Sequence, residues 1–116
     1  MTAERIARND SIFRDVNEQI NAKAKEHDTD EEQAVPFICE CADDHCTTIV
    51  PLSLGEYEDV RTDSRQFLTA FGHERFEGLV AIVSTNHNHL VVRKSGRAGD
   101  IAASLDRRHD GNGNGR

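Results

Sequence analysis

The amino-acid sequence predicts an α+β fold in which a long N-terminal helix is followed by small β-hairpins. Apolar residues recur every seven positions along residues 3–26, which indicates a helix with one narrow apolar stripe. Short apolar and β-branched runs follow between residues 35 and 94, and such runs are typical of strands. Because only 36% of the 116 residues are apolar and none is tryptophan, we expect one domain with a small core.

The stripe of the N-terminal helix has two interpretations. It can pack on the chain's own sheet, or it can pair with another helix of this protein or of a partner. A helix over residues 3–26 would extend about 36 Å, which is long for a domain of this size to cover fully. We expect Phe13 and Val16 to pack within the chain and the first turns around Ile6 to stay partly free. The apolar residues of the stripe and its border are Ile6, Ile12, Phe13, Val16 and Ile20.

Residues 27–34 form an acidic linker in this interpretation. Five carboxylates and no lysine or arginine lie between Glu26 and Glu32. A segment this polar is expected to be solvated. It would separate the N-terminal helix, residues 1–26, from an α+β domain over residues 35–96.

All three cysteines lie in the segment F-I-C-E-C-A-D-D-H-C at 37–46. Thiolate and imidazole groups are the ligands that zinc prefers in structural sites. Cys39 and Cys41 are two residues apart, so their thiols leave an extended backbone on the same face. The small and polar residues before Cys46 can turn the chain back. The spacing C-x-C-x4-C therefore predicts three ligands of a metal site, with zinc as the metal. A redox-active cysteine pair and incidental free thiols are the alternatives.

The fourth ligand is expected to be a histidine, and His73 is the first choice. In F-G-H-E-R-F at 71–76, the glycine lets the backbone bend and the two phenylalanines can anchor the loop. His45 is the second choice, because adjacent residues seldom both reach one tetrahedral ion. His87 and His89 could ligate a separate site, although N-H-N indicates a hairpin turn more simply. The remaining histidines lie in polar ends, where we expect them to be solvated: His27 and His109.

The cysteine segment lies between two runs that predict paired strands, residues 35–39 and 47–50. Two short strands that carry a metal-binding turn are similar to the hairpin of a zinc ribbon, so the domain is expected to be zinc-ribbon-like. Pro51 lacks an N–H group and is expected to end the second strand. The pattern S-L-G-E at 53–56 is a capping box, which opens a helix through Arg61.

A last hairpin is predicted from the strands 78–85 and 89–94, with N-H-N as the turn. Residues 79–83, L-V-A-I-V, are apolar on both faces, which predicts a central, buried strand.

Two shorter helical segments are expected, a turn over residues 65–68 and a thin amphipathic helix over 98–108. The latter belongs to a C-terminal tail, residues 97–116, whose G-N-G-N-G-R end is expected to be disordered. The residues expected to complete the core around the cysteine loop are Phe67, Leu68 and Phe71.

These motifs together resemble a group of small, uncharacterised actinobacterial proteins. The group has an N-x-x-x-F-R-x-V-N-E-x-I helix, an F-x-C-E-C-x4-C loop, an E-Y-x-x-V-R helix and a G-H-E turn. The corresponding segments here are 9–20, 37–46, 56–61 and 72–74, and the resemblance covers about residues 5–94. It implies that the cysteines and His73 belong to one site, and it implies no activity. This chain departs from the group at Ala42, where the loop usually has a glycine.

Charge and composition narrow the function. The net charge of −7 argues against a nucleic-acid surface, and the chain has no membrane-span-like apolar run or secretory signal. The odd number of cysteines favours a reducing cytoplasm. The sequence therefore predicts a cytoplasmic, non-enzymatic structural-zinc protein that acts as a protein-binding or regulatory module. A protein partner would bind the N-terminal helix or the acidic face. The sequence is also compatible with a homo-oligomer.

Two other functions remain as alternatives. The first is a thiol-based redox or metal sensor, in which oxidation of the cysteines ejects the zinc. The second is a catalytic zinc site with three protein ligands and an open position, in which Glu40 or Glu74 would be the general base.

Overall fold

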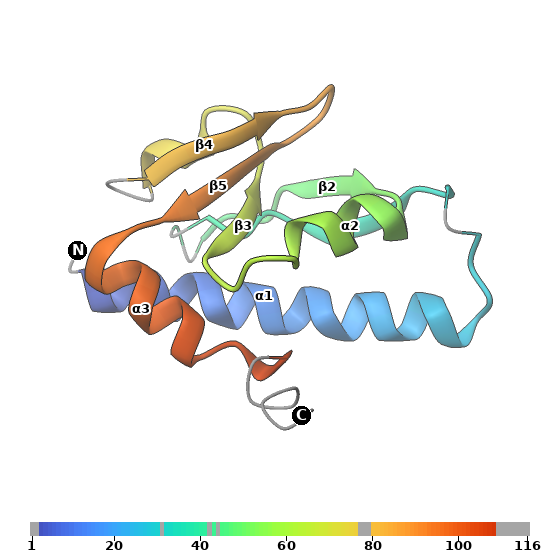
Figure 1. The fold of residues 1–116 in the computed structure, drawn as a ribbon. Helices are drawn as coiled ribbons and strands as arrows, with labels where there is room; N and C mark the ends of the chain where they lie inside the picture. The colour runs from blue at the N-terminus through green and yellow to red at the C-terminus, as the bar shows by residue number, and fades with distance from the viewer. Residues whose placement is uncertain (1–2, 31, 42, 44, 77–79, 109–116) are drawn as a thin grey trace.

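A 24-residue helix, α1 (Ala3–Glu26), runs along the molecule, and the other elements pack along it (Figure 1). The computed structural model describes residues 3–30, 32–41, 43, 45–76 and 80–108. The other elements in the described residues are small antiparallel sheets, two short α-helices and one 3₁₀ helix. The α+β arrangement that the sequence predicts is confirmed.

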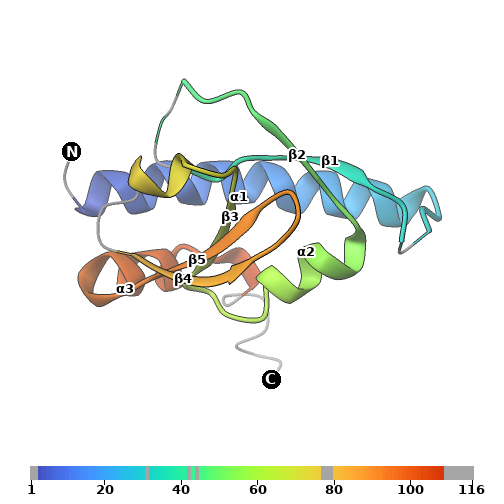
Figure 2. The ribbon, with the colours of Figure 1, turned by 90° about the horizontal axis from the view of Figure 1, so that it is seen from above.

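The strands form two separate sheets. The first pairs β1 (Val35–Ile38) with β2 (Ile49–Leu52), and the cysteine segment connects them. The second has the order β3-β5-β4, with β5 antiparallel to both neighbours. Seen from above, β1 and β2 lie along α1, and the second sheet lies beside them over α3 (Figure 2). The remaining bounds are α2 (Leu54–Val60), β3 (Gln66–Thr69), η1 (His73–Phe76), β4 (Val80–Thr85), β5 (Leu90–Lys94) and α3 (Gly96–Ser104).

The main apolar core lies between α2, β3 and the inner face of the first sheet. The ring of Phe37 in β1 stacks on that of Tyr57 in α2, with the ring centroids 4.3 Å apart. α2 begins at the predicted capping box: Ser53 Oγ accepts from the Glu56 N–H, and Glu56 Oε1 accepts from the Ser53 N–H. The buried residues of this core include Val35, Phe37, Val50, Leu52, Leu54, Tyr57, Val60 and Leu68.

The face that α1 turns inward is mostly polar, which corrects the expectation for its apolar stripe. Val16, expected to pack within the chain, is 39% exposed, and Phe13 is half-buried. The physical reason is that the groups facing α1 are themselves polar, such as the buried Lys94, and need polar partners. The buried α1 residues repeat at helical spacing and are Ala7, Asp10, Ser11, Arg14, Asn17 and Asn21.

The two predicted hairpins are present, but one strand and one proline lie in positions that differ from expectation. The 80–85 strand is β4, an edge strand in which Ile82 and Val83 are 51% and 50% exposed, so the prediction of a central, buried strand is wrong. β5 has partners on both sides instead. Pro51 does not end β2 but lies within it, opposite Pro36. Both prolines are tolerated because a two-stranded sheet has only edge strands.

The expectations for the shorter segments are also corrected in part. Residues 66–69 form β3 rather than a helical turn. Phe67 and Leu68 are buried as expected, but Phe71 is 52% exposed and does not complete the core. The helix expected over 98–108 is α3, which spans Gly96–Ser104. The predicted disordered end at 111–116 lies outside the described residues.

Candidate metal centre

Four side chains from three parts of the chain meet beside the first sheet. One ligand atom from each of Cys39, Cys41, Cys46 and His73 can be chosen such that all four lie within 4.8 Å of one another. Cys39 and Cys41 are buried, and Cys46 and His73 are half-buried. The cysteines follow β1 directly, and His73 begins η1. The structure therefore brings together the four residues that the sequence predicts as one site.

The spacing of these atoms suits a tetrahedral ion. His73 Nδ1 lies 3.5 Å from both Cys39 Sγ and Cys46 Sγ. In a tetrahedron with Zn–S of about 2.3 Å and Zn–N of about 2.0–2.1 Å, a sulfur and a nitrogen ligand are about 3.6 Å apart. Two of the sulfur–nitrogen pairs therefore already stand near the separation of zinc ligands, and all four donor atoms lie within 4.8 Å of one another.

Backbone hydrogen bonds hold the cysteine segment in shape. The Cys39 N–H donates to Thr48 O at 3.0 Å, which continues the pairing of β1 and β2 by one step. The Cys46 N–H donates to Asp43 O at 3.0 Å, and this turn brings the third cysteine back toward the first two. The Ala70 N–H donates to Cys39 Sγ at 3.2 Å. An N–H aimed at a sulfur stabilises a thiolate and is the kind of outer contact that orients a metal ligand.

A glycine in the left-handed backbone conformation positions His73. The chain leaves β3 and turns through Gly72, which has φ of +83°. A Cβ at this position would meet no other atom within 4 Å, so glycine is required by the backbone angle and not by lack of space. The His73 N–H then donates to Ala70 O at 3.1 Å, closing the turn. The same short segment thus supplies both the imidazole and the N–H that contacts Cys39.

The thiols of the two buried cysteines interact with each other. The hydrogen bond between them lowers the pKa of Cys41, and this bond together with burial raises the pKa of Cys39. Cys41 is therefore the thiol that loses its proton more readily. A cation that binds the cluster displaces the thiol protons, since metal ligation requires deprotonated cysteine.

Glu40 points away from the cluster and links it to α1. Its side chain is fully buried, accepts from Asn17 Nδ2 at 2.8 Å and from the Leu68 N–H at 3.0 Å. Burial raises the pKa of Glu40 to about 7, partly offset by these hydrogen bonds. Asn17 also donates to Ile38 O and accepts from the Ile38 N–H, both at 2.9 Å. Through these contacts Glu40 joins the cysteine segment to α1 and to β3.

The remaining described histidines stand apart from the cluster. The His45 side chain is 91% exposed and lies 3.8 Å from Asp43 Oδ1, so His73 and not His45 joins the three cysteines. His89 is buried, with Nδ1 2.7 Å from Asn88 Oδ1, and burial lowers its pKa. His87 and His27 are exposed. His109 lies outside the described residues.

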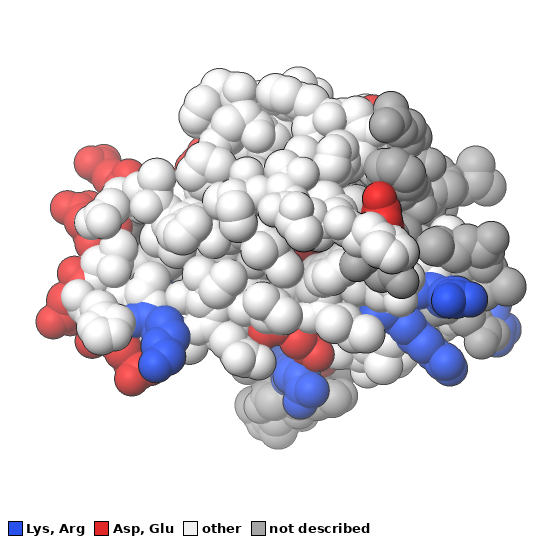
Figure 3. Space-filling view, turned by 180° about the vertical axis from the view of Figure 1, so that it is seen from behind, with Lys and Arg blue, Asp and Glu red and all other residues white. Residues whose placement is uncertain are grey.

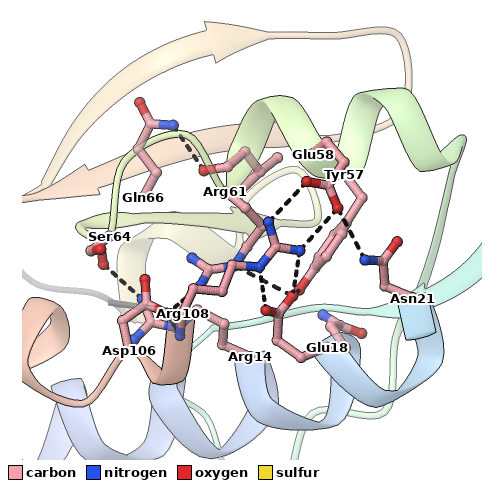
Figure 4. A network of polar contacts seen from close by, with 12 residues as sticks. Arg14, Glu18, Asn21, Tyr57, Glu58, Arg61, Ser64, Gln66, Asp106 and Arg108 are labelled. Atoms are coloured by element: carbon pink, nitrogen blue, oxygen red, sulfur yellow. Dashed lines mark hydrogen bonds and ion pairs between the residues drawn. The ribbon is translucent and has the colours of Figure 1, made fainter. Parts of the chain in front are cut away.

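A second cluster of polar side chains, which sequence reasoning missed, fastens α1 to the rest of the chain (Figure 4). Arg108 contacts two carboxylates, with Nη1 2.9 Å from Glu58 Oε1 and Nη2 3.0 Å from Glu18 Oε2. The Tyr57 hydroxyl donates to Glu18 at 2.7 Å. The buried Arg61 pairs with the buried Asp106. We call the following six residues the charge cluster: Arg14, Glu18, Glu58, Arg61, Asp106 and Arg108.

Arg14 shows why a polar residue suits the buried face of α1. Its guanidinium donates to Ser64 O and to Ala102 O, both at 2.7 Å, and lies 4.6 Å from the centroid of the Phe67 ring. These two carbonyls belong to segments far along the chain. The helical spacing of Asp10, Arg14, Asn17 and Asn21 is the signal from which a polar inner face could have been predicted.

Comparisons with protein-family models, with curated proteins and with solved structures found no match to this chain. Within the described residues, no helix is long and apolar enough to cross a membrane.

Proposed function

We propose that this chain is a small structural-zinc protein that acts as a protein-binding or regulatory module. The observation that carries the proposal is the convergence of three thiols and one imidazole within 4.8 Å. Three sulfur ligands and one nitrogen ligand form a donor set typical of structural zinc. A full set of four protein ligands leaves no open position for a reacting water, which supports a structural rather than a catalytic role.

The position of the site supports this role. Cys39 and Cys41 extend β1, and His73 follows β3, so one ion would join the two sheets. The core of this lean chain is small, and a metal that crosslinks its parts would add the stability that such a core lacks. With its fold held by the ion, the rest of the surface is available to a protein partner. The half-exposed stripe of α1 and the acidic segment after it are the candidate surfaces, and the site would operate in the cytoplasm.

Metal analysis and native mass spectrometry test the proposal. Protein purified without added zinc is expected to hold one zinc per chain. His73→Ala is expected to lower the zinc content strongly, whereas the matched control His45→Ala should keep it, because His45 is exposed and outside the cluster. A wild-type chain that carries no metal, refuses added zinc and shows freely titrating thiols would refute the proposal.

A thiol-based redox or metal sensor is the second candidate, favoured by the lowered pKa of Cys41 and by the partial exposure of Cys46. In such a sensor, hydrogen peroxide would join two thiolates as a disulfide, be reduced to water and release the zinc. The full burial of Cys41 favours the structural module over the sensor, because oxidation-sensitive cysteines are usually accessible to solvent. A peroxide titration with a zinc-binding dye separates the two: the structural module retains zinc at peroxide concentrations that oxidise a sensor.

A further inference from the structure

We infer that this chain associates with a second copy of itself, antiparallel along α1, through an uncharged face formed by α1 and the outer side of the first sheet. The inference does not depend on the identity of the metal. It rests on three observations: the side chains of that face, their position relative to α1, and the charges at its two ends.

The outer side of the first sheet is apolar although it faces solvent. The inward side chains of this sheet are buried, and because Pro36 pairs with Pro51 and Ile38 with Ile49, these four share the opposite side. Ile49 is 53% exposed, both prolines are exposed and Ile38 is half-buried. Antiparallel sheets with one solvated face normally place polar side chains there. An all-apolar outer side therefore indicates that something covers it.

The half-exposed side of α1 continues this surface. Asn17 binds the backbone of Ile38, so the neighbouring turns of α1 lie against β1. Phe13 precedes Asn17 by four residues and lies next to it on the helix surface; it is half-buried, and Val16 is 39% exposed. We call the resulting surface the neutral face, and its residues are Phe13, Val16, Pro36, Ile38, Ile49 and Pro51.

Charges of opposite sign lie at the two ends of this side of the molecule. Figure 3 shows this side: uncharged side chains cover most of the middle, acidic ones predominate at one end and basic ones near the other, with isolated charges of the opposite sign in both halves. The acidic end follows the last turn of α1, and its exposed carboxylates are Glu26, Asp28, Asp30 and Glu32. Lys23 and Lys25 lie on that last turn too, with Lys25 paired to Glu58. The exposed basic residues at the other end are Arg5, Arg8 and Arg97.

This charge pattern selects a second copy and its orientation. In a two-fold contact, each copy uses the same patch. If the two-fold axis lies in the interface and across α1, the basic end of each copy faces the acidic end of the other. A parallel arrangement would place like charges together, which is unfavourable. A stable dimer needs about 800 Å² from each partner, roughly an eighth of the 6452 Å² that the chain exposes.

Sedimentation equilibrium on the metal-loaded full chain, with metal content measured alongside, tests the inference. The wild-type protein is expected to form dimers, and Ile49→Glu should raise the dimer dissociation constant at least about tenfold by burying a charge in the apolar contact. The matched control is Ile82→Glu, since Ile82 is a strand residue of the second sheet with almost the same exposure, 51% against 53%. The dimer dissociation constant of this control should stay within about twofold of the wild-type value.

A charge exchange tests the orientation without disturbing the apolar contact. Arg5→Glu and Glu26→Lys should each weaken the dimer about tenfold at low salt, and the two together in one chain should restore it. Both changes should also stabilise α1, because an acidic side chain near the start of a helix and a basic one near its end interact favourably with the helix dipole. Loss of α1 therefore cannot explain weaker dimers.

Several outcomes would overturn the inference. These are a wild-type chain that stays monomeric up to about 100 µM at low salt, equal weakening by Ile49→Glu and Ile82→Glu, or a double charge variant that is no better than its parents. Retained dimers in a metal-free chain would instead count against the zinc proposal alone.

Discussion

The cysteine–histidine cluster and the charge cluster both join distant parts of the chain, yet they balance charge in different ways. The charge cluster sets three carboxylates against three guanidinium groups and is complete within the protein. Among the described residues, no arginine or lysine is paired with the thiol cluster, so its sulfur ligands carry protons or bind a metal cation. The contribution of the charge cluster to stability should therefore depend on pH and on which partners are substituted. The contribution of the thiol cluster should depend on the supply of metal.

The largest effect is expected at the thiol cluster. Cys41→Ser should lower the melting temperature of the whole chain as strongly as chelation does, because structural zinc contributes about 10 kcal/mol or more in small domains. That is comparable to the total stability of about 5–15 kcal/mol that domains usually have. Calorimetry on the variant and on the chelated wild type measures it. Melting curves that coincide with that of the zinc-loaded wild type would show that the cluster does not hold the fold.

The next effect concerns the buried pair of the charge cluster. Arg61→Met leaves the Asp106 carboxylate buried without its partner and should cost about 3–5 kcal/mol in the free energy of unfolding. The double variant with Asp106→Leu should recover most of this loss, because it removes the stranded charge. Urea titration of both variants gives the two values. A double variant as unstable as the single one would mean that the pair acts through packing.

Asn17 joins α1 to the cysteine segment, so its effect should appear in both stability and metal affinity. Asn17→Ala removes the amide that holds Ile38 and Glu40, at a cost of about 1–3 kcal/mol. Because those residues flank Cys39, zinc affinity should fall about 10-fold or more, as it does when outer contacts of a site are lost. Competition with a chromophoric chelator measures the affinity.

The control for this experiment is Gln19→Ala, an exposed position on the same helix. It should change neither the stability nor the zinc affinity. If Asn17→Ala lowers stability but leaves zinc affinity at the wild-type value, then α1 and the thiol cluster are not coupled.

The smallest effect is a pH dependence from Glu58. Hydrogen bonds from Arg108 lower the pKa of Glu58 to about 2, below its ordinary value of 4.5. A carboxyl with a lowered folded-state pKa adds stability above its unfolded pKa and loses it as the pH falls toward the folded pKa. The stability gap between wild type and Glu58→Gln should thus be constant from about pH 7 to 5 and narrow below pH 4.5. Paired urea titrations of the zinc-loaded proteins test this, and a gap that changes above pH 5 would contradict it.

Local patterns carried enough information to predict several elements. The heptad repeat predicted α1 over its full length, Ser53 and Glu56 predicted the start of α2, and N-H-N predicted the last turn. The cysteine spacing and the Gly72–His73 turn predicted which four side chains come together. The helix, the cap and the turns depend on residues close in sequence, where backbone geometry and hydrogen bonding act directly. The four clustered side chains were predicted from ligand chemistry, because His73 lies 34 residues after Cys39.

Other features depended on the partners that residues meet across the fold. Residues 79–83 are apolar on both faces whether the strand is central or at an edge. Only the sheet order β3-β5-β4 placed the strand at the edge. The direction in which α1 faces was decided by groups such as Lys94, Ile38 O and Ala102 O, which need polar partners when buried. By itself, the sequence determined the long helix, the hairpins and the four side chains that come together in the thiol cluster. The tertiary structure decided which side of the helix is buried, because that choice depends on matching polar groups far apart in the chain.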